Sequence, residues 1–310
     1  MSIPHPLHLT PSYVGRLILR YGTYYMRHLQ RPYRRDLVMS GSRNIRLSLA
    51  LRQKQALRDA FFNIVLDAYT EQTNLKISST TGAVFVLLMD LAQSFDAHFE
   101  KQVAVGGSLV RAELLNEPAL AQKLGALREY LQFFGIVDPV LAQLRACFAA
   151  HYDTYIDLLD QAKGSLCFTD VLHTVELDSG ELTGVLVEVV ALFNGHVLPA
   201  DTRHNFYLFG IAGKFADDLV DLARDVRNDR PNLLHTLLLE NSREWQIWQQ
   251  ASRHKGRLNA RWWNRYCPST LHKYCVHMAE YYDHITSPKL RSACDLMLLP
   301  AVLGVEYDSA

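Results

Sequence analysis

Apolar residues recur along the 310-residue chain at the three- and four-residue spacing of amphipathic helices, and period-2 alternation is nearly absent. Only 16 glycines and 11 prolines interrupt this pattern. The periodicity predicts helices over residues 47–69, 81–103, 119–134, 139–161, 180–194, 203–227, 258–265, 269–285 and 287–303. Caps and breakers mark several ends, at Asp138-Pro139, Asp178-Ser179-Gly180, Pro199-Ala200-Asp201 and Ser287-Pro288. We therefore expect an all-α fold and, because no linker or repeat divides the chain, one domain over residues 1–310.

Composition and charge narrow the class of function. Hydrophobic residues make up 49% of the chain and charged residues 21%, as in an ordinary globular protein. The formal net charge is zero, so no overall field would attract nucleic acid or anionic lipid. The longest apolar run, residues 82–89, stops at Asp90 and is too short to span a membrane. The chain has five cysteines and no CxxC pair, and its N-terminal segment does not have the pattern of a secretory signal. These two features predict free thiols in a cytoplasmic protein.

The most informative segment is an acidic stretch within the predicted helix 203–227. Asp217, Asp221 and Asp225 recur at i, i+4 and i+8, so they share one helix face within about 80° of each other. Like charges at this spacing destabilise a helix by roughly 0.2–0.5 kcal/mol per pair. The rest of this helix is apolar, which predicts that it lies inside the protein. Clustered carboxylates on a buried helix need a compensating cation, and hard oxygen ligands suit Mg²⁺ that bridges to phosphates.

An ordinary acidic face is the alternative interpretation of the same residues. Arg224, Arg227 and Arg230 follow closely and could join the three aspartates in a salt-bridge network. We expect instead that Arg224 reaches the same region without neutralising the acidic row.

The segment from Asp217 to Asp225, DDLVDLARD, resembles the second metal-binding motif of class I terpene synthases, (N/D)Dxx(S/T)xxxE. The resemblance implies that Asp217, Asp221 and Asp225 bind magnesium, with Asp in place of Ser/Thr and of Glu at the last two positions. Arg224 occupies a position where the family often has a lysine that binds diphosphate. The longer stretch FADDLVDLARD also resembles the second DDxxD motif of trans-prenyl diphosphate synthases.

The resemblance implies a second set of carboxylates on an earlier helix. Within residues 81–103, Asp96 and Glu100 are four residues apart and face one way. They are similar to the DxxxD form of the first aspartate-rich motif of squalene and phytoene synthases, with Glu for the last Asp, which implies further magnesium ligands. Asp90 is a weaker candidate. The sequence departs from the family in lacking a DDxxD motif, and Gln93 stands where several relatives carry another acid.

Residues one to three helical turns before these acids are predicted to line a substrate pocket. On the first helix they include Phe85, Met89 and Gln93, and on the second Phe209 and Gly213. Aromatic faces can stabilise a carbocation by roughly 0.5–2 kcal/mol, although such residues are equally what a helical core contains. Gly210 and Gly213 within a helical run indicate a close approach or a local break.

Other motifs are absent or ambiguous. Thirteen histidines show neither HxxxH nor HExxH spacing, and no phosphate-binding glycine loop occurs. Residues 1–40 carry arginines among tyrosines, and this segment could fold over the site as a lid or form a solvated basic helix.

The resemblance implies an isoprenoid synthase helical bundle around a central apolar cavity, with both acidic motifs at its mouth. The implied function is that of a Mg²⁺-dependent terpene synthase, a carbon–oxygen lyase. Such an enzyme ionises an isoprenoid diphosphate, here expected to be C20 and either linear or already cyclised, and the cation is quenched by deprotonation or by water. The alternatives are a prenyltransferase that joins two prenyl diphosphates, of the squalene/phytoene or the chain-elongating type, and a non-catalytic helical protein. We expect no nucleic-acid partner and no transmembrane segment, and a homodimer stays open.

Overall fold

The computed structural model describes residues 4–30, 49–77, 118–132, 135–161, 167–253 and 258–304, together with the single positions 81, 82, 85, 88, 91 and 92. These residues form α-helices and one π-helical turn, joined by short loops, and no strand occurs among them. The prediction of an all-α fold is confirmed.

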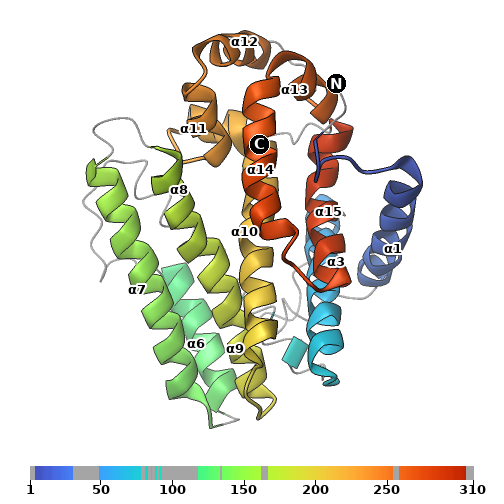
Figure 1. Cartoon of the computed structure of the whole chain (residues 1–310). Coiled ribbons are helices and arrows are strands. Elements are labelled where there is room, and N and C mark those ends of the chain that lie inside the picture. The colour runs from blue at the N-terminus through green and yellow to red at the C-terminus, as the bar shows by residue number, and fades with distance from the viewer. Residues whose placement is uncertain are drawn as a thin grey trace. The chain divides into compact units, whose positions relative to one another are not determined.

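The helices follow one another along the chain as shown in Figure 1. Their bounds are α1 Pro11–Gln30, α3 Leu49–Thr73, α6 Pro118–Gln132, α7 Val137–Gln161, α8 Phe168–Val175, η1 Glu176–Glu181, α9 Leu182–Phe193, α10 Ala200–Arg227, α11 Leu233–Leu239, α12 Ser242–Ser252, α13 Ala260–Tyr266, α14 Pro268–Tyr282 and α15 Pro288–Leu303.

Most predicted helices lie within a few residues of an observed one, but the region before α9 differs. The prediction that Asp178-Ser179-Gly180 separates two helices is wrong. The three residues belong to η1, a π-helical turn that connects α8 directly to α9. The periodicity also gives no indication of the short helices α8, α11 and α12.

The chain divides into two compact units, each built from segments that are distant in sequence. Unit 1 comprises Met1–Leu17, Cys147–Gly184 and His204–Ala310, and unit 2 comprises Ile18–Ala146 and Val185–Arg203. The acidic segment of α10 lies wholly in unit 1.

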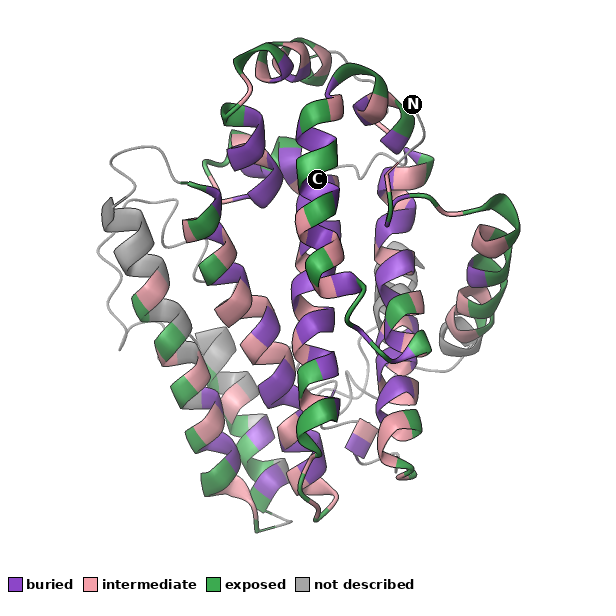
Figure 2. Cartoon of the chain, viewed as in Figure 1, coloured by how far each residue is buried: buried purple, intermediate pink, exposed green. Residues whose placement is uncertain are grey.

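In unit 1, α10 packs against α14 and α15. The Tyr274 hydroxyl on α14 donates to the carbonyl oxygen of Phe215 on α10 at 2.5 Å, and the two rings lie 5.1 Å apart. On α15, the buried Asp295 carboxylate accepts the hydroxyls of Tyr13 at 2.5 Å and Tyr282 at 2.7 Å. The start of α1 is thereby anchored to unit 1. Helices α14 and α15 each bury one side and leave the other more exposed (Figure 2).

Unit 2 contains α3, α6 and most of α9. The Tyr69 hydroxyl on α3 lies 2.9 Å from Nε2 of His196, and the Thr81 hydroxyl donates to Asn194 at 3.0 Å. Arg203 and Glu188 form an ion pair at 2.8 Å. These polar contacts surround buried aliphatic side chains of α3 and α9.

Two further findings bear on the expectations from sequence. Among the described helices, none is long and apolar enough to cross a membrane. All five cysteines lie among the described residues and none of them is in a disulfide, in agreement with the prediction.

The crossing of η1 and α10 depends on a glycine. A Cβ atom on Gly210 would lie 2.0 Å from the Ser179 carbonyl oxygen and 2.7 Å from the Thr183 hydroxyl. Because the first of these is a backbone atom within the π-helical turn, only glycine fits without displacing η1. At Gly213, one turn later, a Cβ would meet only the flexible end of Met297 at 3.3 Å.

This contrast makes a testable pair of variants. Gly210→Ala should destabilise the protein by roughly 3 kcal/mol or more, because overpacking against backbone cannot relax locally. Gly213→Ala should change the free energy of unfolding by less than about 1 kcal/mol, since the gain in helix propensity offsets a small shift of Met297. Urea unfolding of both variants measures the difference. Equal free energies of unfolding would contradict the close packing of η1 on α10.

Candidate functional site

Helix α10 carries the acidic row. The helix begins just after Pro199, with Asp201 in its first turn and Arg224 and Arg227 in its last turn, as its dipole favours. It ends where Asp229 adopts a left-handed conformation with φ of 54°. Apolar residues along α10 are buried and fix its orientation in unit 1, namely Phe206, Phe209, Ile211, Phe215, Leu219 and Leu222.

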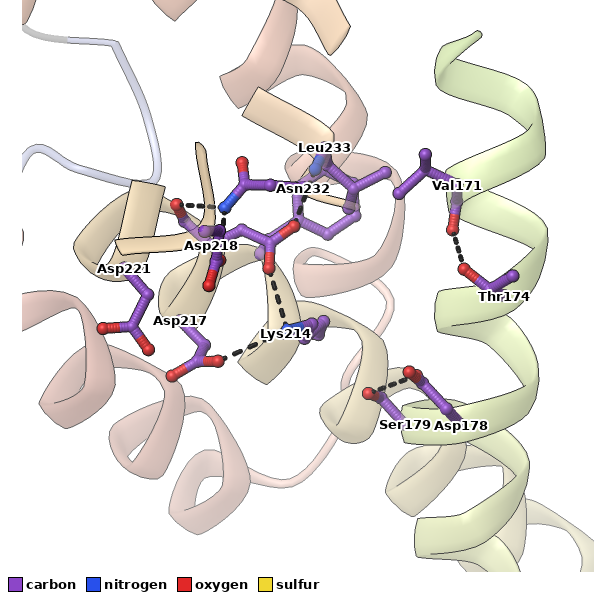
Figure 3. A network of polar contacts seen from close by, with 12 residues as sticks. Val171, Thr174, Asp178, Ser179, Lys214, Asp217, Asp218, Asp221, Asn232 and Leu233 are labelled. Atoms are coloured by element: carbon purple, nitrogen blue, oxygen red, sulfur yellow. Dashed lines mark hydrogen bonds and ion pairs between the residues drawn. The ribbon is translucent and has the colours of Figure 1, made fainter. Parts of the chain in front are cut away.

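The three predicted ligands differ in how far they reach solvent. The Asp217 side chain is 46% exposed, that of Asp221 14% and that of Asp225 5%. Asp217 and Asp221 point to the same side of α10 (Figure 3). The row is therefore accessible at its first residue and becomes buried toward its last.

Asp218, the neighbour of this row, is a buried structural carboxylate. Its side chain is 1% exposed and accepts the backbone N–H of Leu233 at 2.7 Å, while its other oxygen lies 3.0 Å from Nζ of Lys214. Burial raises the pKa of Asp218 to about 7, although the Lys214 ammonium and the Leu233 N–H act in the opposite direction. Asp218 thus connects α10 to the start of α11.

Asn232 holds the buried end of the row. Its side-chain amide donates to the Asp225 carboxylate at 2.9 Å and to the Asp218 carbonyl oxygen at 3.0 Å. Its side-chain oxygen accepts the His235 backbone N–H at 3.1 Å and caps α11. The sequence-based prediction missed this residue. The available signal was an Asn that follows Pro231 and precedes an apolar run, which is typical of an N-cap.

Basic side chains on α10 pair with the acids along the row. Arg224 forms ion pairs with Asp221 at 2.5 Å and with Asp225 at 3.6 Å. Lys214, which the sequence-based prediction also missed, lies 3.4 Å from Asp217. The expectation that Arg224 does not neutralise the acidic row is wrong. Arg224 follows Asp221 by three residues on the helix, and this spacing brings its guanidinium next to the Asp221 carboxylate. An ion-pair network of this kind was the alternative interpretation, although its members differ.

The row nevertheless retains unfavourable negative charge. Burial raises the pKa of Asp221 to about 6, and repulsion by Asp217 adds to the shift, while the Arg224 guanidinium opposes it. An ionised Asp221 therefore destabilises the folded protein. An additional cation near Asp217 and Asp221 would remove this cost.

The carboxylate oxygens of this row are of the donor type that Mg²⁺ prefers. Within the described part of the chain, no three His, Cys, Asp or Glu side chains form a group that could hold a metal ion. Mg²⁺ usually keeps several waters and binds through one or two carboxylates plus substrate phosphates, so a preformed cage of three is not required. Asp217 and Asp221 supply carboxylate oxygens on one side of α10.

The other predicted site residues fall into two groups. Asp96, Glu100, Gln93 and Met89 lie outside the described residues. Phe85 is buried in unit 2, where its ring meets that of Phe62 edge-on at 5.9 Å. In unit 1, Phe209 is buried and Gly213 contacts Met297. A pocket lined by these residues stays a prediction.

No model of a known protein family matches the sequence, and no curated protein matches it either. Two solved structures are similar to the chain over nearly its whole length. A polyprenyl synthase from Roseobacter denitrificans has a TM-score of 0.51 and 14% identity, covering 92% of this chain and 97% of its own. A polyprenyl synthase from Caulobacter crescentus, in complex with calcium and isoprenyl diphosphate, has a TM-score of 0.54 and 15% identity, covering 95% and 98%. The chain therefore has the helical fold of polyprenyl synthases.

The role of Asn232 can be separated from ordinary helix capping. Asn259→Ala removes only the cap of α13, an acceptor for the Trp262 N–H, and should cost about 1 kcal/mol. Asn232→Ala removes a cap and also leaves the buried Asp225 carboxylate without its amide donor, so it should cost roughly 2–4 kcal/mol. Chemical denaturation of the two variants tests this order. A loss at Asn232 no larger than that at Asn259 would mean that the Asp225 contact contributes nothing.

Proposed function

We propose that this protein is a divalent-metal-dependent enzyme that ionises an isoprenoid diphosphate. The observation that carries the proposal is the row of Asp217, Asp221 and Asp225 on one buried helix of a polyprenyl synthase fold. Calcium and isoprenyl diphosphate in the Caulobacter crescentus enzyme support a ligand of this chemistry. The unfavourable ionisation of Asp221 supports a site that is completed by an added cation.

Each acidic residue has a proposed role. Asp217, Asp221 and Asp225 would hold Mg²⁺, together with Asp96 and Glu100 of the earlier motif. When bound, Mg²⁺ supplies positive charge that stabilises a departing diphosphate. Arg224 would contribute a further charge to the diphosphate, because its side chain is 44% exposed and reaches both Asp221 and Asp225.

Apolar residues of the proposed pocket would protect the allylic cation. We assign this lining to Phe85, Met89, Gln93, Phe209 and Gly213. Exclusion of water by such a lining prevents premature capture of the cation, and aromatic faces stabilise its charge.

The subsequent chemistry divides the proposal in two. We favour a terpene synthase, a lyase that acts on one diphosphate, because the spacing of the row matches that family's second motif. The second candidate is a prenyltransferase that joins two substrates, and the names of both structural neighbours favour it. In both cases the carbon–oxygen bond to diphosphate breaks first, and the diphosphate leaves with the electron pair.

Product identification tests the function and separates the candidates. The purified chain should be incubated with C5, C10, C15, C20 and pre-cyclised C20 diphosphates, singly and in pairs, and the products separated by gas chromatography. A terpene synthase yields a hydrocarbon or alcohol with the carbon number of one substrate molecule. A prenyltransferase yields a product with the combined carbon number of two substrate molecules, which are alike in squalene/phytoene-type condensation and include the C5 diphosphate in chain elongation. EDTA should abolish either activity, because the acidic row then lacks its cation. Full turnover in EDTA, or no turnover of any diphosphate, would contradict the proposal.

Asp221→Asn tests whether the row is a metal site or a structural ion-pair network. In metal-free protein the variant should be about 0.5 kcal/mol more stable, because it relieves like-charge repulsion. The wild-type carboxyl has a folded pKa raised to about 6 from 3.8, so rising pH through this window destabilises the wild type. The stability that Asp221→Asn gains over the wild type should therefore be absent below about pH 4 and fully present above about pH 6.

The same variant should lose most turnover, since a ligand for the metal is missing. Magnesium with inorganic diphosphate should also stabilise the wild type more than the variant. A structural network predicts the reverse pattern: Asp221→Asn would be less stable without metal and would respond to magnesium diphosphate as the wild type does.

A further inference from the structure

Lys214 is a basic side chain inside the acidic site. It lies on α10 one turn before the acidic row, and its ammonium is 3.0 Å from Asp218 and 3.4 Å from Asp217 (Figure 3). Its side chain is only 27% exposed, whereas Lys273, in an ion pair with Glu240 on the surface, is 57% exposed. Lys214 therefore contributes its charge within the protein, where screening by water is weak.

Carboxylates surround this ammonium from more than one element. Asp217, Asp218 and Asp225 belong to α10, and Asp178 belongs to η1. A lysine side chain is ordinarily charged at neutral pH, and the neighbouring carboxylates favour its ammonium form.

The position of Lys214 resembles that of a bound cation. Its ammonium contacts two neighbouring carboxylates, and one oxygen of the buried Asp218 faces it. A carboxylate with 1% exposure cannot rely on water, so it needs a cation or hydrogen-bond donors from the protein.

We propose that Lys214 is a built-in counter-ion that takes the place of a metal ion between Asp217 and Asp218. The inference rests on the proposed function, because it concerns the same acidic row. Lys214 keeps divalent metal away from Asp218, reserves that residue for the contact with Leu233, and holds Asp217 in position beside Asp221. It is thus a positioning residue that limits metal binding to the exposed side of the row.

Replacing the ammonium by a neutral side chain tests this role. Met is unbranched and flexible enough to fill the same space, and Gln is a second variant that retains a hydrogen-bond donor. Without metal, Lys214→Met and Lys214→Gln should melt at lower temperature than the wild type. Mg²⁺ alone should then raise their Tm by more than it raises that of the wild type, because the metal can enter between Asp217 and Asp218.

Calorimetric titration with Mg²⁺, without substrate, should show binding on the order of tenfold tighter in the Lys214 variants, since a repelling charge next to the metal has gone. Lys273→Met is the matched control, because it removes a lysine from an exposed ion pair and should titrate like the wild type. Lys214 variants that bind Mg²⁺ no more tightly than the wild type would overturn the proposal.

Failure of this inference is distinguishable from failure of the proposed function. If the wild type turns over an isoprenoid diphosphate and the Lys214 variants show no added response to Mg²⁺, the function stands and the role of Lys214 is wrong. If the variants gain the Mg²⁺ response and no diphosphate is turned over, the counter-ion role stands and the function is wrong.

Discussion

The buried carboxylate of Asp218 accepts the backbone N–H of Leu233 and lies against the Lys214 ammonium. A charge at this depth is strongly destabilising unless both its oxygens are compensated, so the two contacts depend on each other. The contact with Leu233 fixes where the chain returns after α10, and the contact with Lys214 fixes the first turn of the acidic row. Asn232 is brought to the Asp225 carboxylate as a consequence of this return. The geometry of the whole row therefore follows from the compensation of one buried charge.

Electrostatics within unit 1 explain how a row of like charges persists on one helix. Lys214 pairs with the first acids and Arg224 with the last, so each end of the row has a basic partner. The compensation is incomplete at Asp221, whose pKa is raised by burial and by the neighbouring Asp217. Under the proposed function, a cation bound beside Asp221 would remove the remaining cost of its ionisation.

Sequence patterns predicted the parts of the fold that depend on local chemistry. Helices α10, α14 and α15 are predicted to within a few residues, because a proline stands just before α10 and at the first position of α14 and of α15. Asp178-Ser179-Gly180 misled the prediction, since the same residues that usually end a helix here form a π-helical turn whose stability comes from packing on α10. The contacts of Asn232 with Asp225 and of Leu233 with Asp218 could not be predicted either, because they arise only when the chain reverses after Asp229. Periodicity locates a helix face, but it does not reveal which later segment folds back onto it.

The π-helical turn η1 also affects how this chain can be compared with others. A π turn holds about one residue more than the α-helical turn it replaces, and each residue of an α-helix advances the side-chain direction by about 100°. Removing that residue would leave an uninterrupted helix from Phe168 to Phe193 in which side chains on the two sides of the deletion keep roughly their present faces, because about five residues of a π turn cover the rotation of about four α-helical residues. A related sequence with a regular helix here would therefore align only with a one-residue gap in the middle of a helix. A gap inside a helix is usually taken as a sign of misalignment. At this place it would instead show whether the related protein has the π-helical turn against which Gly210 packs.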